Sequence, residues 1–291
     1  MKRVVIISGK GGTGKTTVSA ALVDLAAREK RLVIADADVD AANLELLLEP
    51  QRTSNTPFIA GKTAVIEPSL CVDCGRCMEV CRFDAVQANG QYAIDPQLCE
   101  GCLACLYQCP TGAIRVETRQ SGEWLRSITP YGPMYHANLW PGEENSGKLV
   151  SELIEQAQSE GERENADLLL VDGPPGIGCP VTAACRSADL AILVSEPTVS
   201  GRHDLERVLE LTRYFNLPAA LVLNKATLNE KARAEMLAFA RSENMDVFGE
   251  IPYDEGAIEA LFSAQPLTRM DNHPLKDSLE SIWVRLKEKM E

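Results

Sequence analysis

The sequence predicts an α/β protein with a mostly parallel sheet, helices on both faces and a small α+β module inserted into the chain. Three observations lead to this prediction. Short apolar runs rich in β-branched residues alternate with helical segments along most of the 291 residues, as in parallel sheets. A glycine-rich segment joins the first apolar run to the first helix. A cysteine-dense, turn-rich segment interrupts the alternation between residues 70 and 116.

The expected elements follow one another in the order that a parallel sheet requires. Continuous apolar runs predict buried strands at residues 3–8, 31–38, 166–173, 188–197, 219–225 and 247–254. Helical patterns separate them, at residues 15–30, 146–161, 201–215 and 229–244. A last, amphipathic helix has an apolar face formed by Leu279, Ile282, Trp283 and Leu286. We expect this face to pack on its own domain rather than on a membrane.

Composition and charge restrict the class of protein. Asp and Glu number 42 against 29 Lys and Arg, and no basic block is present, so we expect no nucleic-acid partner. The first apolar run is too short for a signal peptide, and no run approaches the roughly 18 apolar residues of a membrane helix. We therefore expect a cytoplasmic protein without stable membrane insertion. In such a protein, ten cysteines indicate metal ligands rather than disulfides.

The glycine-rich segment from Gly9 to Thr16 matches the P-loop pattern G-x-x-x-x-G-K-[ST] between a strand and a helix. Glycines let backbone N–H groups turn towards phosphate oxygens, and the helix N-terminus adds positive charge. Lys15 is predicted to neutralise the β- and γ-phosphates, and the Thr16 hydroxyl to bind Mg²⁺. The motif thus predicts a P-loop NTPase that binds ATP through Gly11, Gly12, Thr13, Gly14, Lys15, Thr16 and Thr17.

A second lysine, Lys10, lies inside the same loop, where an ordinary P-loop does not need one. It could reach a partner's nucleotide, as an arginine finger does, or it could be a solvated loop residue. The segment "KGGTGKTT" resembles the deviant Walker A loop of the MinD/ParA ATPases, and the resemblance covers about residues 1–60 and 118–291. It implies that Lys10 crosses the interface of an ATP-bound homodimer.

The same resemblance implies roles for residues elsewhere in the chain. Asp38 resembles the acid that orients the attacking water, although Asp36 and Asp40 are close enough to be alternatives. The catalytic residues are therefore expected to be Lys10, Lys15 and Asp38. Asp172 in "LLLVDGPPG" resembles the acid that holds Mg²⁺ through water. The adenine-binding segments are expected at Asn224, Pro252 and Asp254.

The spacing C-x2-C-x2-C-x3-C occurs twice between residues 71 and 109, at a constant offset of 28 residues. It is typical of bacterial two-cluster ferredoxins, in which the fourth cysteine of each run ligates the other cluster. One [4Fe–4S] cluster is predicted on Cys71, Cys74, Cys77 and Cys109. The other is predicted on Cys99, Cys102, Cys105 and Cys81. Zinc is the competing interpretation, because Cys₄ zinc sites also use C-x2-C pairs.

The cysteine repeat predicts an inserted ferredoxin domain at residues 61–117, within an ATPase domain formed by residues 1–60 and 118–291. This combination resembles MinD-type ATPases that carry such an insertion. Three functions are compatible with it. The chain could be an ATP-gated electron carrier, an assembly or carrier ATPase for iron–sulfur or metal cofactors, or a MinD-like spatial organiser with a redox-sensing module. The first two imply a redox or metal-cofactor partner protein.

Two cysteines lie outside the repeat. Cys179 follows Asp172 by seven residues, the spacing of a cluster-ligating cysteine in the nitrogenase iron protein, which this chain resembles. We expect Cys179 to be a small residue packed in the core, with a third, labile cluster as the alternative. Cys185 is expected in a helix that faces the core.

Overall fold

The computed structural model describes residues 1–143, 146–257 and 262–291, which form two compact units. Unit 1 contains Met1–Thr56, Trp124–Leu139 and the chain from α5 onward; unit 2 contains Pro57–Glu123 and a short segment from Trp140. The boundaries between them lie within two long strands, β3 (Gln51–Ile66) and β6 (Ile114–Thr129). The domain boundaries expected from the sequence lie within the same two strands.

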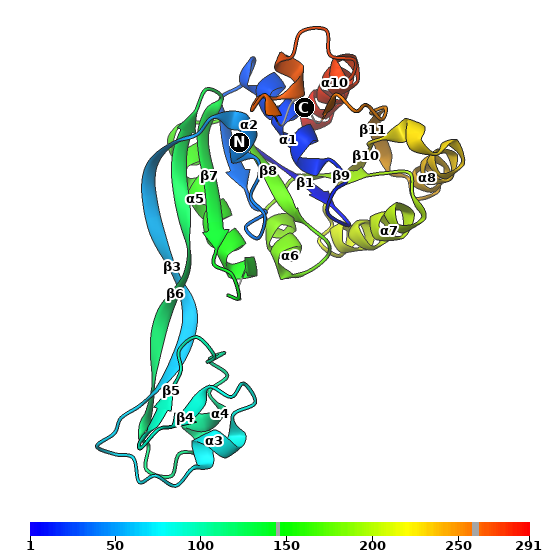
Figure 1. The fold of residues 1–291 in the computed structure, drawn as a ribbon. Helices are drawn as coiled ribbons and strands as arrows, with labels where there is room; N and C mark the ends of the chain where they lie inside the picture. Colours follow the sequence, from blue (N-terminus) through cyan, green and yellow to red (C-terminus); the bar gives the residue numbers. More distant parts are fainter. Residues whose placement is uncertain (144–145, 258–261) are drawn as a thin grey trace. The chain divides into compact units, whose positions relative to one another are not determined.

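Unit 1 is built on a largely parallel sheet with the strand order β11-β10-β9-β1-β8-β2-β7-β6-β3 (Figure 1). The strands predicted from apolar runs are β1 (Lys2–Ser8), β2 (Leu32–Asp36), β8 (Leu168–Pro175), β9 (Leu190–Ser195), β10 (Ala219–Leu223) and β11 (Asp246–Glu250). Each of them pairs in parallel with its neighbours in this group. The predicted α/β fold of a P-loop NTPase is therefore confirmed for unit 1.

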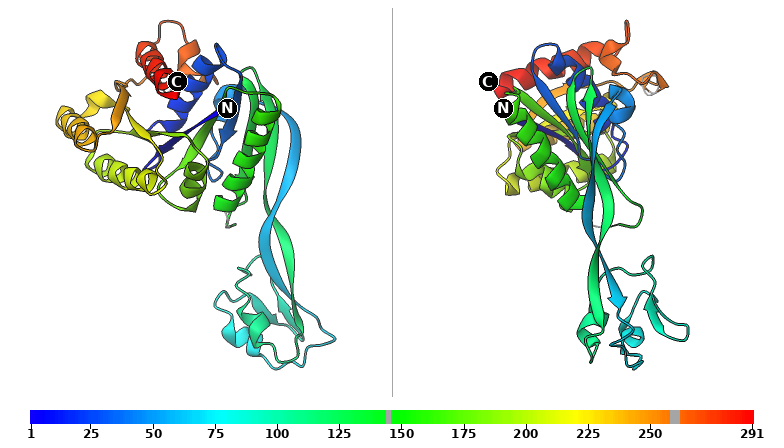
Figure 2. Two further views of the ribbon diagram at one scale, coloured as in Figure 1. Left: turned by 180° about the vertical axis from the view of Figure 1, so that it is seen from behind. Right: turned by 90° about the vertical axis from the view of Figure 1, so that its left-hand side faces the viewer.

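Helices cover both faces of this sheet (Figures 1 and 2). On one face, α1 (Lys15–Ala27) packs against α10 (Lys276–Met290). On the other lie α5 (Ser146–Arg163), α6 (Cys179–Arg186) and α7 (Val199–Tyr214), while α8 (Glu230–Ser242) packs against β11. The apolar face of α10 is buried in the core of unit 1, as predicted from its amphipathic pattern. In the described ranges, no helix is both long and apolar enough to cross a membrane.

Outside the elements of unit 2, three strands (β3, β6 and β7) and a short helix were not predicted from the sequence. After the short helix α2 (Glu45–Leu48), the chain enters β3, and β6 is joined by a tight turn to β7 (Gly132–Leu139). The first five residues of β3 are exposed and polar, so they lack the apolar alternation by which a strand is recognised. In contrast, β7 is buried at its centre because it pairs in parallel with β2.

Unit 2 repeats its backbone at the 28-residue offset of its cysteines. Its elements are α3 (Arg76–Val80), β4 (Val86–Ala88), β5 (Tyr92–Ile94) and α4 (Ala104–Gln108), and α3 contacts α4. The N-cap positions of α3 and α4, Gly75 and Leu103, have φ of 76° and 63°. Hydrogen bonds repeat as well, because Glu67 N donates to Ala113 O and Asp95 N donates to Ala85 O, each at 2.7 Å. The sequence repeat is therefore also a structural repeat.

Candidate functional site

The loop from Gly9 to Gly14 connects β1 to α1 and has the conformation that a phosphate site needs. Gly12 and Gly14 have φ of 78° and 88°, in the left-handed region that favours glycine. A Cβ atom at Gly14 would collide with the side-chain amide of Asn224, which donates to the carbonyl oxygen of Thr13 at 2.7 Å. Because α1 begins at Lys15, its first N–H groups follow directly on this loop.

Lys15, Thr16 and Asp172 form one bonded network at the start of α1. Lys15 Nζ lies 3.0 Å from Asp172 Oδ1 and 3.4 Å from Asp38 Oδ2. Thr16 Oγ1 donates to Asp172 Oδ2 at 2.9 Å, and Ser19 Oγ donates to Oδ1 at 2.7 Å. Burial disfavours the charge of Lys15, but the neighbouring carboxylates outweigh burial and raise its pKa. The lysine, hydroxyl and acid predicted for phosphate and Mg²⁺ therefore lie together.

The three acids near the end of β2 have different surroundings. Asp36 is fully buried and accepts backbone N–H groups of Asp38 at 3.2 Å and Leu44 at 3.0 Å. Burial raises the pKa of Asp36 to about 8. Asp38 is half-buried beside the phosphate lysine, whereas Asp40 is exposed. Of the three candidates, Asp38 is thus the one placed beside the phosphate site.

Lys10 binds two elements of its own chain. Its Nζ lies 2.7 Å from Glu196 Oε1 and donates to Ser200 Oγ at 2.9 Å. Glu196 also pairs with Lys225, whose Nζ lies 3.0 Å from Oε2 and donates to the Gly12 carbonyl oxygen at 2.8 Å. Burial opposes the charge of Glu196, but the two lysines lower its pKa. Lys10 is therefore ion-paired here, although 31% of its side chain remains exposed.

A cavity of about 290 Å³ opens beside the P-loop. It is lined by Gly14 and Thr17 from the loop and α1, and by several apolar residues of the C-terminal region. Its wall also contains all three residues expected to bind adenine, Asn224, Pro252 and Asp254. A largely apolar cavity with a few polar groups suits a planar heterocyclic base.

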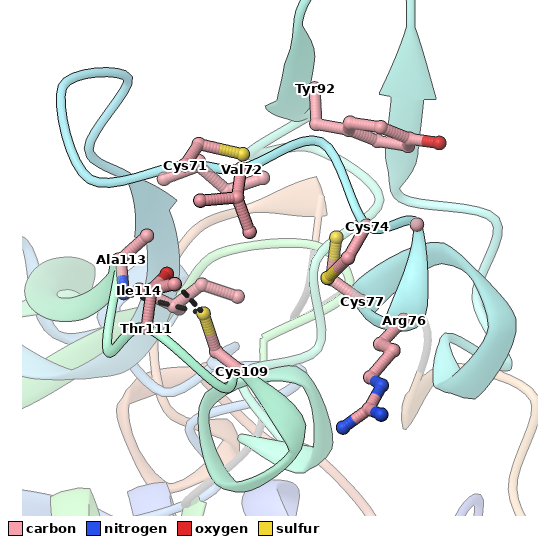
Figure 3. A pocket seen from close by; sticks show the side chains of 12 residues that line it. Cys71, Val72, Cys74, Arg76, Cys77, Tyr92, Cys109, Thr111, Ala113 and Ile114 are labelled. Carbon is pink, nitrogen blue, oxygen red and sulfur yellow. Dashed lines mark hydrogen bonds between the residues drawn. The ribbon is translucent and has the colours of Figure 1, made fainter.

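In unit 2, the first cysteine site, which we call site A, surrounds one cavity and consists of Cys71, Cys74, Cys77 and Cys109. Figure 3 shows the four sulfur atoms around a common space. Ala113 N donates to Cys109 Sγ at 3.3 Å, and Thr111 Oγ1 lies 3.7 Å from the same atom. Burial opposes deprotonation, but these bonds outweigh it and lower the pKa of Cys109.

The second cysteine site, site B, surrounds a separate cavity and consists of Cys81, Cys99, Cys102 and Cys105. Burial raises the pKa of Cys105 here and of Cys77 in site A. The grouping of the eight cysteines is the one that the ferredoxin spacing predicts, with the fourth cysteine of each run placed in the other site. Sites A and B therefore contain the two sets of four cysteines that were predicted for the two clusters.

The placement of the cysteines bears on the choice between zinc and a cluster. Within the described ranges, no three His, Cys, Asp or Glu side chains converge closely enough to hold a single ion. A zinc ion requires sulfur ligands at about 2.3 Å, whereas a four-iron cluster keeps its thiolates further apart. The donor set and its spread therefore fit a cluster better than they fit zinc.

The core of unit 2 is small. Its described apolar cluster consists of Ala64, Ile66 and Ile114, and five of the cysteines pack against it. A unit of this size buries too little apolar surface to be stable without metal, disulfide or other reinforcement. The described cysteines are free of disulfides. The packing of unit 2 therefore leaves a stabilising role for bound metal.

The two remaining cysteines differ from each other. Cys185 is buried in α6, as expected, and burial raises its pKa to about 12. The expectation that Cys179 packs in the core is wrong, because its side chain is exposed. Cys179 is the first residue of α6, and its backbone and Cβ lie close to Gly147 of α5.

Three residues of the nucleotide site were not singled out from the sequence: Ser19, Glu196 and Lys225. Ser19 lies one helical turn after Lys15, which places both side chains on the same face of α1. Glu196 directly follows β9, and Lys225 lies two residues beyond the end of β10. Polar residues at the carboxyl ends of parallel strands were the available signal, since binding sites form at that edge of a sheet.

Comparison with known proteins agrees with the fold and the nucleotide site. A family model described as the CobQ/CobB/MinD/ParA nucleotide binding domain matches residues 4–267, so the chain belongs to this family. An uncharacterized protein of Methanocaldococcus jannaschii is 33% identical over 286 residues, which cover 98% of this chain and 96% of the relative. Membership confirms the predicted P-loop ATPase, with a nucleotide as its ligand.

Two more distant proteins are informative. The septum site-determining protein MinD of Pyrococcus horikoshii, solved in complex with Mg-ADP, has the same fold, with a TM-score of 0.61 and 17% identity over 99% of this chain and 97% of the other. An iron–sulfur cluster carrier protein of Pyrococcus horikoshii is 22% identical over 308 residues, covering 99% of this chain and 86% of the carrier.

Proposed function

We propose that this protein is an ATPase that couples a nucleotide-driven homodimer switch to electron transfer through two [4Fe–4S] clusters in unit 2. The observation that carries the proposal is the grouping of eight cysteines into sites A and B. Each site collects three cysteines of one sequence run and the fourth of the other. Bound clusters would supply one-electron transfer at these sites.

The residues of unit 2 are suited to hold such clusters. Cysteine thiolates are the usual ligands, and backbone N–H groups such as Ala113 N stabilise negative charge on a ligating sulfur. The small apolar cluster of unit 2 gives metal binding a structural role in addition. Both features favour permanently bound clusters over non-specific metal binding.

In unit 1, Lys15 and the P-loop amides would hold the phosphates, with Thr16 and Asp172 at Mg²⁺. Asp38 would orient the attacking water. Lys10 would leave Glu196 and bind the nucleotide of the second subunit, which makes hydrolysis depend on a homodimer. The ion pair with Glu196 is compatible with this role, because Lys10 Nζ is held by Glu196 and Ser200 while Lys15 serves the phosphates of its own subunit.

The position of the insertion in the chain supports coupling. Unit 2 lies between Asp38 and Asp172, the two acids of the nucleotide site. Segments that contact the γ-phosphate and Mg²⁺ change conformation on hydrolysis in nucleotide switches. A change at either acid can therefore be transmitted along the chain to unit 2. We expect the physiological acceptor to be a redox or metal-cofactor partner protein.

A second function is favoured by the similarity to an iron–sulfur cluster carrier protein. In that case iron and sulfide, not electrons, would be delivered to the partner. A single experiment separates the two. The anaerobically purified protein is reduced with a chemical reductant and freed of the excess. It is then incubated with Mg-ATP and, in parallel samples, with an oxidised redox protein as electron acceptor or with a cluster-free protein as iron acceptor. Constant iron on this chain together with reduction of the acceptor supports electron transfer, whereas ATP-dependent loss of iron supports a carrier.

A further inference from the structure

The 28-residue repeat allows sites A and B to be compared position by position. Their backbones match, as the paired helices and positive-φ residues show. Their linings do not. Thr111 lines site A where Phe83 lines site B, and Arg76 lines site A where Ala104 lines site B. The two sites thus offer the same ligands in different electrostatic surroundings.

The first difference is a hydrogen bond to a ligand sulfur. Thr111 Oγ1 lies 3.7 Å from Cys109 Sγ (Figure 3). A cysteine that binds iron has lost its proton, so the hydroxyl must then be the donor. The repeat equivalent of Cys109 is Cys81, and Phe83, which takes the place of Thr111, has no side-chain proton to donate. Cys109 therefore gains a donor that the lining of site B does not supply at that position.

Each site also has an acidic side chain nearby, and the acid of site A opposes the effect of the Thr111 hydroxyl. Asp73 Oδ1 lies 3.6 Å from Cys71 Sγ in site A. Glu100 lines site B. Negative charge disfavours reduction of a nearby cluster, and it does so at both sites. A higher potential at site A therefore requires that the hydrogen-bond donor and the positive charge at site A outweigh Asp73.

Positive charge near the cavity favours reduction at site A more than at site B. Arg76 lines its cavity. At site B, Arg119 donates to the backbone oxygen of Cys99 at 3.3 Å, but its charge is compensated by Glu143 at 3.0 Å. Arg82, next to the site B ligand Cys81, is exposed and lies outside the cavity lining. Among the described residues, the cation that lines a cysteine cavity without an ion-pair partner is therefore Arg76 of site A, although its side chain is also exposed.

We propose that site A holds the cluster of higher reduction potential and that Thr111 is the residue that sets this order. The inference rests on the proposed function, since it requires both clusters. Reduction adds a negative charge, which the Thr111 hydroxyl and Arg76 stabilise at site A. With both clusters bound, the residues of site A would favour transfer of one electron from a reduced cluster at site B, which would be oxidised, to an oxidised cluster at site A, which would be reduced. No proton or further reactant takes part.

The test is an EPR-monitored redox titration of the full-length, anaerobically purified protein with dithionite as reductant. Thr111→Val keeps the shape but removes the hydroxyl. We expect it to lower the upper of two midpoints and leave the lower one unchanged. The equilibrium constant between the sites should fall by up to about tenfold, or 59 mV for a one-electron couple. The matched variant Phe83→Thr, which adds a hydroxyl to site B, should raise the lower midpoint.

A conservative control separates the hydroxyl from the packing of residue 111. Thr111→Ser retains the donor, so both of its midpoints should stay at the wild-type values. The inference is overturned if Thr111→Val shifts the lower midpoint, or neither midpoint, while all variants carry as much iron as the wild type. That outcome leaves the proposed function intact. If the wild type binds no iron, the proposed function fails and this inference fails with it.

Discussion

Lys10 and Lys15 lie five residues apart in one loop but have different partners. Lys15 is buried among Asp172 and Asp38, whereas Lys10 is bound to Glu196. We predict that Lys15→Ala weakens nucleotide binding itself. Lys10→Ala should bind ATP normally but hydrolyse it at least about 10³-fold more slowly, as for loss of a finger residue supplied in trans. Isothermal titration and phosphate release distinguish the two effects. Normal hydrolysis by a monomeric Lys10→Ala protein would exclude the trans role.

Asp38 is separated from its neighbours by its surroundings. It lies 3.4 Å from Lys15 Nζ, while Asp40 is exposed. We predict that Asp38→Asn slows hydrolysis by about 10²- to 10⁴-fold and leaves an ATP-bound dimer that does not dissociate, because the attacking water is no longer oriented. Size-exclusion chromatography with ATP and a phosphate-release assay measure the two properties. The control Asp40→Asn should behave as the wild type; a similar loss in both variants would contradict the assignment.

At the scale of elements, Glu160 joins α5 to the β6–β7 pair. It is 2% exposed and accepts from Arg126 Nε at 2.7 Å and from the Tyr135 hydroxyl at 2.5 Å. We predict that Glu160→Gln lowers the free energy of unfolding by about 1–3 kcal/mol, since a charged hydrogen bond is lost. The control Glu155→Gln, on the exposed side of α5, should change it little. Denaturant titration followed by circular dichroism measures both.

The ion pair of Arg126 with Glu160 should also make the free energy of unfolding depend on pH. Hydrogen bonds from Arg126 lower the pKa of Glu160 below its unfolded value of about 4.3. The stabilisation is therefore complete above that pH and is lost as the pH falls towards the folded pKa. The difference in unfolding free energy between wild type and Glu160→Gln should narrow below about pH 4.3. A difference that stays constant with pH would show that the charge of Glu160 is not involved.

The two helix starts of unit 2 offer a further prediction. Leu103 has φ of 63° at the position where the first repeat has Gly75. The left-handed conformation costs a non-glycine residue roughly 1–2 kcal/mol, so Leu103→Gly should stabilise the protein by about 0.5–1 kcal/mol. Gly75→Ala should destabilise it, because its Cβ would also lie 3.1 Å from the Tyr92 hydroxyl. The unfolding midpoint in denaturant checks both signs, and a destabilised Leu103→Gly would contradict the strain argument.

Local patterns allowed most of the fold and site to be predicted. The P-loop and the cysteine spacing place their ligands within a few residues of one another, and the apolar runs of β1, β8 and β9 identify buried strands. β3 was not predictable from periodicity, because its first residues are exposed and polar. The Glu196 ion pairs were also missed, since they form only when the ends of β9 and β10 meet the P-loop. The exposure of Cys179 depends on packing at a helix start, which spacing alone does not report.

For the molecule as a whole, we predict that metal content and stability are linked. The anaerobic protein should carry about eight iron and eight sulfide per chain. Removal of iron with a chelator should make unit 2 sensitive to protease while unit 1, which has its own extensive core, remains resistant. Iron analysis and limited proteolysis followed by mass spectrometry measure this. Stoichiometric zinc, or a protease-resistant unit 2 without metal, would contradict it.

The crossed arrangement of the cysteines has a consequence for how such a unit can arise. Each 28-residue copy places three cysteines in one site and its fourth in the other. A chain with a single copy cannot complete a site alone, but two such chains can complete both by pairing symmetrically. When both copies lie in one chain, they pair within the molecule, and completion of the two sites no longer depends on protein concentration. Within one chain the two copies need not be identical, and they differ at the positions of Thr111 and Phe83.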